Sequence, residues 1–344
     1  MANVQGTHGL EELNDLELAI VLSLTAQQHC IVFADGPTDD LLRQLQATIG
    51  NRFAVQSATV SCTATTTVDE LNESLLVIDD SYERSSSDAG ETHTDSQKIE
   101  LGHAHHEFRG RRHSSSPSNG LDNRTIADIV LARNIDLASE SVQVQVLELL
   151  RSKRVFTRTA MHTAPSGFIM IAILSTTGGR MTKHLHDMVA SSHMHDKIRT
   201  GPVQLIAPDP LRRASYMQRS DIEQLRSLAV TVHMTAEVAA YLHNIVLFMR
   251  LSRYIMAGVT PTATKHLRCV AHALAPLHGL DYVPPSLVAL AARMVYGHRL
   301  VLATPQTERS LQWGSDPDAV SRMLEGVTVN DVIDRVLEDT DAPL

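Results

Sequence analysis

The chain has 344 residues, which is enough for two domains and a sizeable core. Apolar residues make up 43% of it and aromatic residues only 4%, so we expect an aliphatic core. The 39 acidic residues outnumber the 30 basic ones, and the resulting formal charge of −9 argues against a general nucleic-acid binder.

Cysteine usage and the apolar pattern indicate the cellular compartment in which the protein works. Cys30, Cys62 and Cys269 lie far apart without C-x-x-C pairing, which argues against a disulfide framework or a zinc site. The first 20 residues carry acids where a signal peptide carries bases, and no apolar run approaches the roughly 18 residues of a membrane helix. The sequence therefore predicts a soluble intracellular protein, of the cytoplasm or nucleus, with neither membrane nor nucleic-acid partners.

The first 80 residues alternate helices with short apolar strands. Gly50 follows the second helical pattern at a position where glycine often ends a helix. The apolar periodicity predicts helices over 9–29, 39–49 and 69–75, and strands over 30–35, 53–62 and 76–78.

Residues 81–120 have a different composition, with serine clusters, scattered charges and almost no apolar periodicity. Such a segment cannot bury enough surface to offset its ordering entropy, which predicts a disordered insertion within a domain. Its histidines, among them His103, His105 and His106, could bind a transition metal, but a solvated polar tract is the favoured interpretation. The run of Arg109 to His113 before three serines would suit phosphorylation.

Order returns after residue 120. Apolar runs over 125–131 and 167–174 predict buried strands, residues 138–153 a helix and residues 154–159 a hairpin strand. Helices that alternate with buried strands indicate a parallel sheet covered on both faces, which is an α/β fold.

The last third is predicted to be helical, without strands from about residue 229 onward. Predicted helices cover 235–256, 260–278, 284–297 and 328–338. We therefore expect an α/β core formed by residues 1–80 and 121–225, interrupted by the insertion at 81–120, and a helical domain over 226–344.

The stretch FADGPTDD, residues 33–40, joins a predicted strand to a predicted helix, as a phosphate-binding loop does. Counted from Gly36, the loop spacing G-x-x-x-x-G-K-[ST] would require glycine, lysine and a hydroxyl where the chain has Leu41, Leu42 and Arg43. Asp39 and Asp40 would repel an anion at the start of the helix. The junction of strand and helix suits a nucleotide-binding loop, whereas the side chains in it do not suit a phosphate.

A second histidine cluster, His184, His186, His193 and His195, has Asp187 and Asp196 nearby. A metal site is one interpretation, and a polar helix–loop segment is the favoured one. No nucleophile stands beside a base in a recognisable hydrolase motif.

Two long stretches resemble one family. ARNIDLASESVQVQVLELLRSKRVF, from Ala132, is similar to the segment after the second acidic motif in MoxR-type AAA+ ATPases and the magnesium-chelatase ATPase subunit. TPTATKHLRCVAHALAPLHGLDYVPPSLVALAARMVYGHRL, residues 260–300, resembles the lid segment of the same family, down to its final His298-Arg299-Leu300. The resemblance implies a P-loop-type parallel sheet, the AAA+ core, followed by an all-α lid.

The resemblance also shows which family motifs are degenerate. The magnesium-holding aspartate and water-activating glutamate fall near Ala132 and Arg133, and the arginine-finger region reads Leu185 to Met188. The family positions and their neighbours leave a degenerate nucleotide pocket without catalytic residues or metal ligands. Its members would be Gly36, Arg43, Arg133, Asn134, Ser175 in place of the first sensor, and Thr262 in place of the second.

Three functions follow as hypotheses. The first is a pseudo-ATPase that acts as a scaffold or regulatory subunit of a protein assembly, with protein partners in a homo- or hetero-oligomeric ring. The second, which the resemblance implies at face value, is an ATP-dependent, magnesium-chelatase-like ATPase with ATP and magnesium as cofactors. The third is an adaptor regulated through the loop at 81–120. Hydrolysis rests on charge neutralisation by lysine, magnesium and arginine, so the motif losses favour the first.

Overall fold

A computed structural model describes residues 13–53, 55–78, 124–158, 160–176, 179–195 and 217–343. The predicted insertion at 81–120, the first residues of the predicted N-terminal helix and Asp196 lie outside these ranges. None of the described helices is long and apolar enough to cross a membrane.

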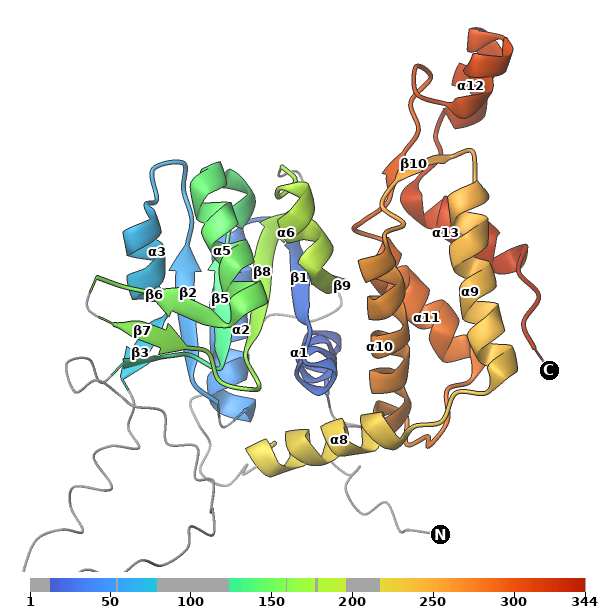
Figure 1. Ribbon diagram of the computed structural model, residues 1–344. Coiled ribbons are helices and arrows are strands. Elements are labelled where there is room, and N and C mark those ends of the chain that lie inside the picture. The colour runs from blue at the N-terminus through green and yellow to red at the C-terminus, as the bar shows by residue number, and fades with distance from the viewer. Residues whose placement is uncertain are drawn as a thin grey trace, which may run out of the picture.

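Five parallel strands form the central sheet (Figure 1). Their order is β2-β5-β8-β1-β9, so β1 lies between two strands that come later in the chain. The strands are β1 (His29–Ala34), β2 (Ser57–Ser61), β5 (Ile129–Arg133), β8 (Ile169–Ser175) and β9 (Val189–His195). Their parallel direction brings all their carboxyl ends to one edge of the sheet.

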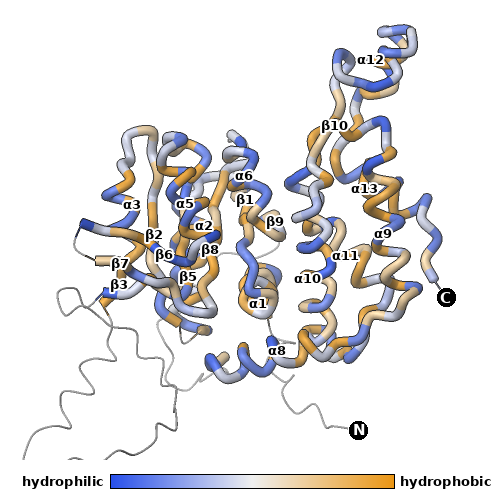
Figure 2. Tube along the Cα trace, in the orientation of Figure 1, coloured by the Kyte–Doolittle hydropathy of each residue, from blue (hydrophilic) through white to orange (hydrophobic). Residues whose placement is uncertain are grey.

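Helices cover both faces of this sheet, because alternate strand residues face opposite ways. Ile31 packs with α3 (Val68–Ser74), α5 (Glu140–Ser152) and α6 (Lys183–Met188). Its neighbours Cys30 and Val32 face the other layer. That layer contains α1 (Asp15–Ala26), α2 (Thr38–Arg52) and α8 (Arg219–Thr231). The predicted α/β sheet is confirmed. Figure 2 shows apolar residues concentrated in its central strands.

Short elements complete the core. They are the hairpin of β3 (Leu76–Ile78) with β4 (Arg124–Ile126), the hairpin of β6 (Arg154–Phe156) with β7 (Met161–Thr163), and η1 (Ile135–Leu137). One predicted helix end is wrong: α2 continues past Gly50 to Arg52. Ile49 is buried against the sheet, and the bond from Phe53 N to Ile49 O closes the last turn, so packing outweighs the glycine.

The second domain is helical, as predicted. Its helices are α9 (Ala236–Leu251), α10 (Pro261–Leu277), α11 (Pro285–Tyr296), α12 (Pro317–Leu324) and α13 (Val329–Glu338), with η2 (Arg309–Trp313). Four of these helices share one apolar cluster, and α12 projects from the domain (Figure 1).

The prediction of a lid without strands is wrong. β10 (Ile255–Ala257) pairs with β11 (Val301–Leu302), and the helix predicted over 235–256 ends at Leu251. The partner strand lies more than forty residues away, and it supplies the backbone bonds that take Ile255 out of the helical pattern.

Helix α8 joins the two domains. Ile222 and Leu225 on its first half pack in the sheet's core, and Val232 directly after its end packs in the lid's core. The predicted domain division at residue 225 falls inside this helix.

Candidate functional site

The carboxyl edge of the sheet gathers four of the predicted site residues. Gly36 follows β1, Arg133 ends β5 and Asn134 follows it, and Ser175 ends β8. Backbone bonds from Asn134 N to Ile173 O (2.9 Å) and from Thr176 N to Ala34 O (3.3 Å) hold these strand ends together. Ligands of open α/β sheets bind at this edge, where the strand order reverses direction. In this sheet the reversal occurs at β1, since the chain passes from β1 to one side and later returns to β9 on the other.

The positions that the resemblance assigns to the phosphate loop are structural. Leu41 and Leu42 in α2 are 1% and 8% exposed and pack against the sheet. A lysine at 42 would reach a phosphate only by leaving this apolar layer. Gly36 keeps a φ of 128°, a conformation that side chains rarely adopt, so the turn of such a loop is present without its cationic end.

An ion pair occupies this edge. Arg133 Nη1 contacts Asp39 Oδ1 in the first turn of α2. The Arg133 side chain is 20% exposed, and its Nε is buried without a hydrogen-bond partner among the described residues. The carboxylate therefore neutralises the one cation that lies at the end of β5, and it does so at the helix terminus where a phosphate would bind.

The remaining two predicted residues lie elsewhere. The Arg43 side chain is 77% exposed and lies 3.9 Å from Asp40 on the same helix. Thr262 is the second residue of α10 in the lid. Its neighbour Thr260 caps that helix and donates to Asp187 Oδ1 at 2.6 Å. The structure thus joins Gly36, Arg133, Asn134 and Ser175 at one edge, and separates Arg43 from them on the surface of α2.

Sequence reasoning missed two acids at this edge. Asp39 was read as a repulsive charge, and its role as the partner of Arg133 was not predicted. Asp136, in η1, has one carboxylate oxygen buried without a hydrogen-bond partner in the described part of the chain. Burial raises the pKa of the nearby Cys62 thiol to about 11, and Asp136 adds to the shift. The sequence could have indicated both acids by their position, because each lies a few residues after the end of a predicted strand.

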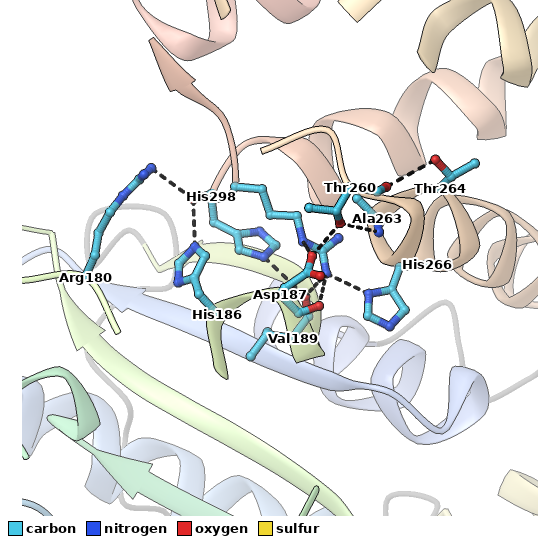
Figure 3. A network of polar contacts seen from close by, with 10 residues as sticks. Arg180, His186, Asp187, Val189, Thr260, Ala263, Thr264, His266 and His298 are labelled. Carbon is cyan, nitrogen blue, oxygen red and sulfur yellow. Dashed lines mark hydrogen bonds and ion pairs between the residues drawn. The ribbon is translucent and has the colours of Figure 1, made fainter. Parts of the chain in front are cut away.

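A polar network joins the core to the lid (Figure 3). Arg299 is 3% exposed and donates to the carbonyl oxygens of Asp187, at 2.9 Å, and Val189. The Arg299 nitrogen that makes both bonds, Nη2, lies 2.6 Å from His266 Nδ1. His186 Nε2 lies 2.9 Å from the carbonyl oxygen of His298, to which Arg180 also donates.

Burial sets the protonation states in this network. It lowers the pKa of His266 to about 4, with help from the Arg299 charge, and lowers the pKa of His298 well below its usual range. It also lowers the pKa of Arg299 to about 10, although Asp187 opposes the shift. The histidines are therefore neutral, and Arg299 is charged, at neutral pH.

The second histidine cluster does not gather around one point. His186 faces His298, with ring centroids 5.2 Å apart, and is engaged by the lid. Within the described ranges, no group of three or more His, Cys, Asp or Glu side chains could hold a metal ion.

Comparison with known proteins concerns the lid and the fold. Residues 247–322 match the family model of the AAA lid domain. A crystal structure of a candidate ATPase from Cytophaga hutchinsonii is similar, with a TM-score of 0.61 and 13% identity over 95% of this chain and 89% of that chain. A full-length MCM homolog from Methanopyrus kandleri has a TM-score of 0.48 and 13% identity over 87% of this chain and 59% of that one. No curated protein matches the sequence.

Proposed function

We propose that this chain is an AAA+ protein, and a pseudo-ATPase of the MoxR and magnesium-chelatase type. The α/β sheet and the match of residues 247–322 to the AAA lid domain support this proposal. The chain would act as a scaffold or regulatory subunit of a protein assembly, in a ring or on a partner. The single observation that carries the proposal is the ion pair of Arg133 with Asp39 at the sheet edge where a phosphate would lie.

The residues at this edge do not fit a magnesium nucleotide. Phosphoryl transfer needs a cation on the phosphates and a carboxylate on the metal. Leu42 is buried at the lysine position, and β5 ends in Ala132 and Arg133 in place of acids. The cation at the end of β5, Arg133, is already neutralised by Asp39. An incoming triphosphate would have to displace that carboxylate and meet the exposed Asp40 on the same helix turn.

What remains intact is the framework. The Gly36 turn, the α2 packing and the core–lid network around Arg299 all persist. A retained framework around an edge that does not suit nucleotide is what a structural subunit requires. The resemblance to ring-forming ATPases supports a protein assembly as the setting.

The test is calorimetric titration of the full chain with ATP and ADP, with and without magnesium, paired with an ATPase assay. We expect no saturable binding at millimolar nucleotide and no turnover above background. Magnesium-dependent turnover would contradict the proposal and establish the alternative, an ATP-dependent ATPase subunit. The oligomeric state, measured by light scattering alone and with candidate partners, tests the scaffold role.

The third hypothesis, an adaptor regulated through residues 81–120, concerns a segment outside the described residues. Deletion of 81–119 tests it directly. Unchanged partner binding by the deleted chain would remove it.

A further inference from the structure

A cavity of about 210 Å³ lies between the core and the lid, apart from the carboxyl-edge residues discussed above. Arg180, Lys183 and Asp187 line it from the core. Gly258, Thr260 and Arg299 line it from the lid. None of the six residues predicted for the nucleotide pocket is among its lining residues.

The charges around this cavity favour an anion. Its lining contains three basic residues, Arg180, Lys183 and Arg299, and one acidic residue, Asp187. That carboxylate already accepts a hydrogen bond from Thr260 and lies 3.8 Å from Arg299 Nε. His186 adds no charge near neutral pH, because burial lowers its pKa.

Arg299 supplies the second observation. Its side chain is buried, yet Nε and Nη1 have no hydrogen-bond partner among the described residues. Only Nη2 makes the bonds to the core carbonyls and to His266. A buried charged donor without a hydrogen-bond acceptor carries a desolvation cost, so an acceptor is expected there.

We propose that this cavity binds a phosphate group, which Arg299 contacts from the lid while Arg180 and Lys183 contact it from the core. The planar guanidinium with two free donor sites suits an oxyanion, and the lysine adds a point charge. Donors that converge from two domains match a tetrahedral group better than a planar carboxylate. Met181 and Val301 form apolar walls beside these donors, which suits a phosphomonoester that carries a small apolar part.

The site is independent of the proposed loss of ATP hydrolysis, because it uses other residues. Its ligand would bridge α6 and the lid, and so would stabilise the attachment of the lid to the core.

Isothermal titration of the full chain with inorganic phosphate, phenyl phosphate and acetate tests the proposal, at constant ionic strength with chloride. We expect saturable phosphate binding and a raised melting temperature. Tighter binding of phenyl phosphate would identify a phosphomonoester as the ligand, and equal binding would identify free phosphate. Binding of acetate as strong as that of phosphate would overturn the assignment, as would no saturation at tens of millimolar phosphate.

Lys183→Gln provides the sharpest variant, because this residue is exposed at the start of α6 and the fold should survive its loss. We expect about tenfold weaker phosphate binding, as for the loss of one charge-assisted contact. Lys265→Gln, on the exposed face of α10, is the matched control and should bind as the unaltered chain does. Arg133→Gln should also leave phosphate binding unchanged. A loss in either of these two variants, or none in Lys183→Gln, would place the anion elsewhere.

Discussion

At the scale of single residues, the carboxyl edge of the sheet carries charges opposite to those that the family resemblance leads one to expect. A cation, Arg133, stands where the family resemblance expects an acid, and an acid, Asp39, stands in the turn that would hold phosphates. The two satisfy each other, so the edge needs no ligand to balance its charge. Either residue without the other would leave an uncompensated charge at this edge.

Asp39→Asn removes the carboxylate and leaves the Arg133 charge available. We expect the free energy of unfolding to fall by less than about 1 kcal/mol, because the Asp39 side chain is 60% exposed. Affinity for pyrophosphate, measured by calorimetry, should rise. Asp40→Asn on the same helix is the control and should change this affinity less. Equal gains in both variants would mean that helix charge alone, and not Arg133, attracts the anion.

Gly258 is the second residue-scale feature. Its φ is 111°, and a Cβ there would lie 2.4 Å from the Arg299 carbonyl oxygen. Gly258→Ala should lower the free energy of unfolding by about 3 kcal/mol or more, through backbone strain and displacement of Arg299. Gly50→Ala, in the interior of α2 with open space around it, should raise it by about 0.5–1 kcal/mol. Circular dichroism in urea measures both, since the single tryptophan, Trp313, is already 87% exposed.

At the scale of elements, the attachment of the lid to α6 and β9 depends on Arg299. Arg299→Met should lower the free energy of unfolding by about 3 kcal/mol or more, because the carbonyls of Asp187 and Val189 lose their donor. Arg293→Met breaks only the half-exposed ion pair with Asp334 and should cost under about 1 kcal/mol. Similar losses in the two variants, in the same urea titration, would show that the buried network contributes no more than a surface pair.

At the scale of the whole molecule, buried neutral histidines predict acid sensitivity. Burial lowers the pKa of His29 to about 3 and that of His266 to about 4, below their usual 6.5. The unfolded chain therefore binds more protons below pH 6.5, and stability is lost as the pH falls from 6.5 toward 4. The slope should reach about 1.4 kcal/mol per pH unit for each such histidine. Unfolding titrations between pH 7.5 and 5 measure it, and an NMR resonance of the His29 ring that titrates near pH 6.5 would contradict it.

Sequence patterns predicted the sheet and the lid well, because both depend on local features. Buried strands are continuous apolar runs, as in Ile169–Ser175, and the lid helices begin at prolines such as Pro261 and Pro285. The pairing of β10 with β11 escaped prediction, since strands of three and two residues carry no periodicity. Helices α8 and α12 were likewise not predicted, and the segment of β9, a strand of the central sheet, was expected to be a polar helix–loop segment.

The candidate site divides in the same way. The family resemblance grouped six residues, of which the structure joins four at strand ends: Gly36, Arg133, Asn134 and Ser175. Their role in a nucleotide pocket stays a prediction. The partnership of Arg299 with Asp187 spans 112 residues, and no local pattern announces it. The same holds for Asp39 with Arg133, whose contact depends on which strand lies beside β1.

Helix α8 has a consequence for how the two domains can move. The segment that follows it is bonded into the lid, since His233 N donates to Asp281 O and Val283 N donates to His233 O, both at 2.9 Å. The usual place for a flexible joint is therefore rigid, and α8 must travel with the lid. A relative displacement would therefore slide Ile222 and Leu225 across the base of the sheet, and would also shift Arg299 on α6 and β9, which is a shear and not a hinge motion. Shear between packed side chains allows only small displacements. This lid is therefore suited to small changes of its position on the core and not to wide opening.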